Sequence, residues 1–103
     1  MPQQHLPTVK FQFISDPAHG WLIVSPQWIG AVGLNLAQFS PHSYVHPDGT
    51  LALEEDCDAP IFLDAYKRCF GETIAFQELH VENMNAPGHV RSWYSLHAPG
   101  LAA

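Results

Sequence analysis

Basic residues are scarce in this chain. Lys and Arg together number four among 103 residues, against ten Asp and Glu, and the formal net charge is −6. Because binding to phosphates needs a basic patch, this balance argues against direct contact with nucleic acid. An acidic surface is suited instead to a basic protein partner.

Long apolar runs are missing as well. No stretch approaches the roughly 20 apolar residues that a membrane-spanning helix requires, which argues against contact with a membrane. The first residues, 1–5, lack the charged and apolar regions of a secretory signal peptide. We therefore expect a cytoplasmic protein whose two cysteines, Cys57 and Cys69, stay reduced.

Most short motifs with a known chemistry are also absent. The sequence has no C-x-x-C or H-E-x-x-H zinc motif, no glycine-rich phosphate loop and no serine nucleophile elbow. We accordingly predict neither a cofactor nor a metal. Zinc is a weaker alternative, for which the candidate ligands are His19, His42, His46 and Cys57.

Apolar residues, by contrast, are plentiful. They make up 47% of the chain, and aromatic residues 12%, which is typical of a folded protein and not of a disordered one. A chain of this length forms one domain with one modest core. We predict a single domain over 1–103, with frayed ends at about 1–7 and 97–103.

Alternating apolar and polar residues predict two β-hairpins. The first consists of a strand over 9–15, a turn with Pro and Gly over 16–20 and a strand over 21–24. The second joins strands over 42–46 and 50–54 through a Pro-Asp-Gly turn.

Two helices are predicted from their start and stop signals. A Ser-Pro pair favours a short helix over 26–32. The stronger prediction is a helix over 59–70, with Asp58 capping its first turn and Gly71 ending it. Its apolar stripe includes Cys69, which we expect in the core.

Further strands are expected over 73–81 and 90–96. Hairpins that alternate with helices favour an α+β domain, with an antiparallel sheet of about 4–6 strands and two helices packed on one face. The expected order along the chain is β-β-α-β-β-α-β.

The most unusual segment is the acidic stretch 53–60, where four carboxylates surround one thiol. One interpretation is structural, with Asp58 as a helix cap and the other carboxylates in solvent. The alternative is a surface that binds basic side chains of a partner, which would relieve the repulsion between these carboxylates. Metal binding is a third and weaker alternative, because the alternating pattern of a calcium loop is missing.

A second candidate site combines Asp16 and His19 of the first turn with the thiol of Cys57. Asp16 and His19 have the chemistry of an acid–base pair. The competing interpretation is turn geometry, in which the Asp side chain binds the backbone of the loop. For Cys57 the carboxylates nearby disfavour a thiolate, whereas a helix N-terminus favours one, and a packing role is the simpler interpretation.

Several motifs together resemble a family of small proteins from phages, plasmids and other mobile elements. They are F-x-F-I-x-D-P-x-H-G-W-L over 11–22, Ser-Tyr at 43–44, L-E-E-D-C-D-A-x-x-F-L over 53–63 and V-R-S-x-Y over 90–94. The chain departs from the family pattern at Ala18, where Gly is usual, and in a less charged first helix. The family has no established activity, so the resemblance implies a genetic setting and no catalytic residue.

That setting favours an inhibitor of host machinery. The leading hypothesis is a small acidic protein that binds a basic surface on a host protein, in its sharpest form an anti-CRISPR or other counter-defence inhibitor in the host cytoplasm. The residues expected to bind the partner are Glu54, Glu55, Asp56 and Asp64, with Tyr44 or Trp28 as an aromatic anchor.

Two alternatives come from other functional classes. One is a small enzyme or metal-binding protein centred on Asp16, His19 and Cys57. The other is a homo-oligomeric accessory protein that buries the helix of Trp28 in a dimer, so both a monomer and a homodimer are compatible with the sequence.

Overall fold

The computed structural model describes residues 10–72 and 74–97. They form one mixed sheet of six strands in the order β5-β1-β2-β4-β3-β6, together with two α-helices. The strands are β1 (Lys10–Ser15), β2 (Gly20–Val24), β3 (Tyr44–Val45), β4 (Leu51–Glu54), β5 (Ala75–His80) and β6 (Tyr94–Ser95). The predicted α+β class is confirmed, and the sheet is mostly antiparallel. The one parallel pair joins β5 to β1.

Both predicted hairpins are present. β1 and β2 pair around the turn that begins at Asp16, and Ser15 lies opposite Gly20 in the register. β3 and β4 pair around the Pro-Asp-Gly turn, in which Gly49 has a φ of 96°. Such a φ strains any residue with a Cβ atom, and this is why glycine suits the turn.

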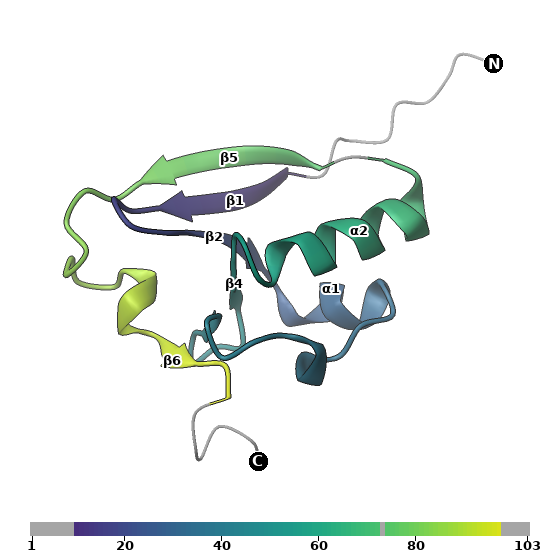
Figure 1. Cartoon of the computed structure of the whole chain (residues 1–103), viewed down its shortest axis with the longest axis horizontal. Coiled ribbons are helices and arrows are strands. Elements are labelled where there is room, and N and C mark those ends of the chain that lie inside the picture. Colours follow the sequence, from purple (N-terminus) through teal and green to yellow (C-terminus); the bar gives the residue numbers. More distant parts are fainter. Residues whose placement is uncertain (1–9, 73, 98–103) are drawn as a thin grey trace.

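The helices α1 (Pro26–Ala31) and α2 (Ala59–Phe70) cover one face of the sheet, and Figure 1 shows them together on one side of β1 and β2. α2 has the predicted bounds and ends at Gly71, whose φ of 69° is left-handed. The core beneath α2 contains Phe11, Leu22 and Phe62, and the rings of Phe11 and Phe62 meet edge to face.

The opposite face of the sheet is covered by the C-terminal segment. A 3₁₀ turn, Val90–Ser92, precedes β6 and places the fully buried side chain of Val90 against Trp21 and Ala52. Figure 1 shows this segment returning from the end of β5 toward β6. The sheet therefore has helices on one face and a returning loop on the other.

Three local predictions were wrong. The strand expected over 90–96 begins instead with the 3₁₀ turn Val90–Ser92, and only Tyr94–Ser95 is a strand. Asp58 makes no side-chain cap to α2, because its carboxylate accepts hydrogen bonds from Ser40 and Ser43 instead. Cys69 is exposed at the end of α2 and not in the core, while Phe62, Ala65 and Tyr66 fill the buried stripe. The frayed ends were predicted at about 1–7 and 97–103, and all of these residues except His97 lie outside the described residues. In the described part of the chain, no helix is long and apolar enough to span a membrane.

Candidate functional site

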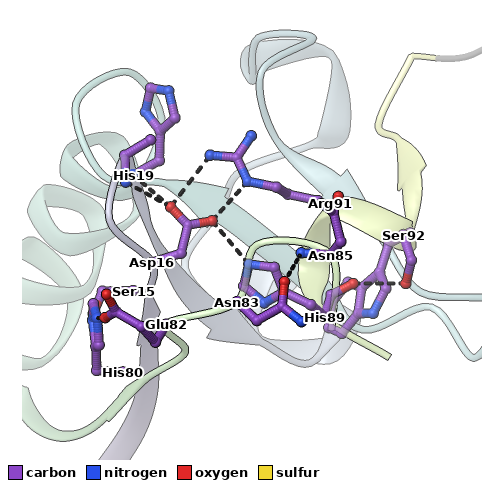
Figure 2. A network of polar contacts seen from close by, with 12 residues as sticks. Ser15, Asp16, His19, His80, Glu82, Asn83, Asn85, His89, Arg91 and Ser92 are labelled. Atoms are coloured by element: carbon purple, nitrogen blue, oxygen red, sulfur yellow. Dashed lines mark hydrogen bonds and ion pairs between the residues drawn. The ribbon is translucent and has the colours of Figure 1, made fainter. Parts of the chain in front are cut away.

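The carboxylate of Asp16 is the centre of a buried polar network (Figure 2). Its Oδ1 accepts hydrogen bonds from the backbone N–H groups of Ala18 and His19, each at 2.9 Å, and these bonds close the turn. Its Oδ2 accepts from Arg91 Nε at 2.7 Å and lies 2.9 Å from His89 Nε2. The side chains of Asp16 and His89 are essentially inaccessible to solvent. Turn geometry, one of the two interpretations of Asp16, is thus confirmed.

This network lowers the pKa of Asp16 well below its usual range, chiefly because the Arg91 side chain bonds the ionised carboxylate. The pKa of Arg91 is raised in return. The Arg91 guanidinium also lies over the Trp21 ring, 5.4 Å from its centroid. Figure 2 shows the His19 imidazole turned away from the Asp16 carboxylate. Asp16 therefore fastens the C-terminal segment to the first hairpin and has no free oxygen for proton transfer with His19.

The acidic stretch divides into internal and external carboxylates. Glu54 is buried, and its carboxylate accepts the backbone N–H of Asp56 at 2.8 Å and that of Cys57 at 3.2 Å. Asp58 is buried as well and binds the two serines named above. Only Glu55 and Asp56 remain exposed. Glu54 therefore stabilises the turn before α2, and Asp58 ties the start of α2 to the loop of Ser40 and Ser43. Both carboxylates are occupied by internal hydrogen bonds and are not free to bind a partner.

A hollow of 330 Å³ lies beside the Asp16 network, and it brings several candidate residues together. Its lining consists of His19, Trp21, Pro41, His42, Tyr44, Glu54, Asp56, Cys57 and Arg91. His19 and Cys57 of the second candidate site thus share one surface with Tyr44 and Asp56. Cys57 is an exposed residue, but partial desolvation raises the pKa of its thiol, and the charges of Glu54, Asp58 and Asp56 raise it further. A thiol with a raised pKa is a poor nucleophile at neutral pH.

The candidate metal ligands do not form a metal centre. Within residues 10–72 and 74–97, no three His, Cys, Asp or Glu side chains are grouped as metal ligands would be. The Nδ1 atom of His46 instead lies 3.0 Å from Oδ1 of Asp48 in the second hairpin, and the His46 ring packs against Trp93. Cys57 and Cys69 are both free thiols.

A second surface runs between α2 and the edge strand β5. Two adjoining hollows of 240 and 220 Å³ share Leu63 and Phe76 in their linings. We call their combined surface the acidic groove; it is lined by Phe13, Leu22, Glu55, Ala59, Leu63, Asp64, Lys67, Glu72, Ile74, Phe76 and Glu78. Four carboxylates and one ammonium group thus surround apolar side chains. The predicted binding residues Glu55 and Asp64 belong to this groove, whereas Asp56 and Tyr44 belong to the hollow.

Trp28, the other predicted anchor, is half-buried at the edge of the core. Its ring meets Phe11 at 5.4 Å and Tyr66 at 5.7 Å between centroids.

Sequence reasoning missed Arg91 and His89, which contact Asp16 across more than seventy positions of the chain. It also missed Phe76 and Glu78, although their alternation in the predicted strand 73–81 placed both on one face.

Comparisons with protein-family models, with curated proteins and with solved structures found no match.

Proposed function

We propose that this chain is a small binding protein, without catalytic activity, that holds a basic surface of a partner protein in the acidic groove. The observation that carries the proposal is the composition of that groove. Glu55, Asp64, Glu72 and Glu78 surround an apolar floor, against one basic residue, Lys67. The exposed ring of Phe76 lies between these charges.

Such a groove can attract a basic partner electrostatically and can then bury apolar area against it. Carboxylates of one sign raise the rate of encounter with a basic partner, and salt screens that effect over about 10 Å at 0.1 M. The apolar floor adds affinity that salt does not remove, because burial of apolar area is favourable in any buffer. We therefore expect a complex that forms rapidly and weakens as salt is added.

The sharpest version of the proposal is inhibition of a nucleic-acid-handling complex in a bacterial host. Proteins that bind nucleic acid carry the basic surfaces that an acidic groove would fit. The resemblance to small mobile-element proteins favours the same class of target. Occupying a basic channel would exclude nucleic acid from it, and the protein would act by occupation of that site alone.

Charge reversal within the groove tests this proposal. A tagged chain is incubated with a bacterial lysate, and retained proteins are compared at low and at high salt. We expect the double variant Glu55→Lys/Glu78→Lys to lose the partner that the natural chain retains at low salt. The double variant Asp48→Lys/Asp56→Lys is the matched control, because it changes the net charge equally at exposed positions outside the groove.

The two variants separate the possible outcomes. Retention by the control and loss by the groove variant would support the proposal. Equal loss in both would assign binding to net charge alone, and equal retention would exclude the groove.

A small-ligand or catalytic site in the hollow is the second candidate function. The observation that favours it is that His19 and Cys57, which are distant in sequence, line one cavity. Its test is a screen of small polar compounds against the labelled protein by NMR. Shifts that are confined to the hollow and disappear in Cys57→Ser would support it, and an absence of shifts would exclude it.

A further inference from the structure

We propose that β5 receives an extended, basic segment of the partner as an additional strand of the sheet. This inference rests on the function proposed above and specifies how the partner binds. β5 pairs only with β1, so within residues 10–72 and 74–97 no strand pairs with the backbone N–H and C=O groups of its outer edge. Figure 1 shows β5 as the outermost strand of the sheet. Open edges of this kind are used for recognition by strand addition.

β5 has few of the features with which proteins protect an open edge, and its one charged residue is Glu78. Natural edge strands are short, carry Lys or Pro, or are covered by other segments. β5 has six residues, contains neither Lys nor Pro, and is exposed from Phe76 to His80. Phe76 and Leu79 are 48% and 47% exposed, and they lie on opposite faces of the strand. An open edge with apolar groups on both faces and a single carboxylate is suited to a basic partner strand.

The side chains of β5 define the chemistry of that strand. Phe76 and Glu78 are two residues apart, so both face the acidic groove. A partner residue opposite Glu78 would be Lys or Arg, and one opposite Phe76 would be aromatic or aliphatic, because opposite charges and apolar pairs stabilise adjacent strands. On the other face, Leu79 favours an aliphatic partner. The expected segment alternates basic or aromatic residues with aliphatic ones.

A second copy of this chain is a poorer occupant. When the β5 strands of two copies pair antiparallel, residues that lie opposite each other point to the same face of the joined sheet. In the two registers with the greatest overlap, Glu78 lies opposite either Glu78 or Phe76 of the second copy. The first register opposes like charges and the second opposes a carboxylate to an apolar ring, and both disfavour pairing. The charge of the groove therefore favours a basic strand over self-association.

The probe for this inference is a short synthetic peptide of lysine alternating with valine, blocked at both ends, with its central lysine replaced by phenylalanine. Two control peptides carry glutamate for lysine or a methyl group on every backbone nitrogen. The first removes the charge complementarity, and the second keeps the side chains but removes the backbone donors. Binding is followed by NMR and by amide hydrogen exchange on the full chain.

We expect the lysine peptide to slow the exchange of β5 amides by about tenfold or more, since new backbone bonds protect them. Both control peptides should fail to do so. Glu78→Lys should weaken binding of the lysine peptide by about tenfold, whereas Asp48→Lys, at an exposed position outside the groove, should leave it unchanged.

Three results would overturn the inference. The first is binding of the lysine peptide at the groove without protection of β5, which would leave the basic-partner proposal intact. The second is protection of β5 in a dimer of the free chain, detected by light scattering, which would identify a second copy as the occupant. The third is an absence of peptide binding at millimolar concentration, while the capture experiment above would still test the basic partner separately.

Discussion

The central strand β4 and the edge strand β5 belong to one sheet but differ in almost every respect. All four residues of β4, Leu51–Glu54, are buried between α2 and the C-terminal segment. In β5 only Ala75 is half-buried, and the residues that follow are exposed. Each strand carries one carboxylate: Glu54 binds backbone amides, whereas Glu78 faces the acidic groove. The centre of the sheet therefore supplies stability, and its edge is available for binding.

The largest loss of stability should come from truncating a core side chain that packs over the central strands. Phe62→Ala removes a fully buried ring that contacts Phe11, and we expect it to lower the free energy of unfolding by about 3 to 5 kcal/mol. Urea unfolding followed by tryptophan fluorescence would measure this loss. A loss below about 1 kcal/mol would contradict the assignment of this ring to the stabilising centre.

Asp16→Asn should have the next largest effect. The amide retains an oxygen for the two turn N–H groups but leaves Arg91 and His89 without their carboxylate. We expect a loss of about 2 to 3 kcal/mol, which is less than for a fully buried pair because Arg91 is partly exposed. Asp48→Asn, in the exposed turn of the second hairpin, is the matched control and should cost much less.

The same carboxylate predicts a dependence of stability on pH. The folded pKa of Asp16 is lowered below the unfolded value of about 3.9. Its stabilisation is therefore complete above that value and is lost as pH falls from about 4 toward the folded pKa. Unfolding free energies measured between about pH 3 and 6 should fall more steeply in the natural chain than in Asp16→Asn. Parallel curves would show that Asp16 is not held as an anion by Arg91.

Gly20→Ala should both lower the free energy of unfolding and move side chains that line the groove. A Cβ atom at Gly20 would lie 2.5 Å from Phe13 Cζ and 3.0 Å from Glu55 Oε2, so both side chains must move. We expect a loss of about 1 to 3 kcal/mol, because the Phe13 ring is packed against the core. Chemical shifts of Phe13 and Phe76 would report the movement, since the two rings meet edge to face. Unchanged shifts and stability would contradict the close contact.

Glu78→Lys should have the smallest effect on stability. The side chain is exposed on the edge strand, so we expect the free energy of unfolding to change by less than about 0.5 kcal/mol. Thermal unfolding would check this value. A loss comparable to that of Asp16→Asn would show that the edge is part of the stabilising structure.

Local sequence patterns were sufficient to predict much of the fold. Alternation identified both hairpins, and the signals at 59–70 gave the bounds of α2, because each depends on residues within a few positions. The parallel pairing of β5 with β1 could not be predicted in this way, since nothing within β5 specifies its neighbour. A strand with an exposed apolar residue on each face has no clear preference for one side of a sheet.

The site was less predictable for the same reason. The acidic stretch looked uniform in sequence, yet Glu54 and Asp58 turned inward because Ser43 and nearby backbone amides offered them partners. Asp16 was recognised as a turn residue, but its ion pair with Arg91 depends on the path of the C-terminal segment. Such partners are distant in sequence and become neighbours only through the fold.

In the proposed function, the β5 edge and its groove bind a partner and contribute little to folding. The double variant Phe76→Ser/Glu78→Lys separates these two roles, with unfolding free energy and low-salt capture measured on the same preparation. We predict stability within about 1 kcal/mol of the natural chain and loss of the captured partner. Retained capture, or a loss of several kcal/mol in stability, would contradict this assignment.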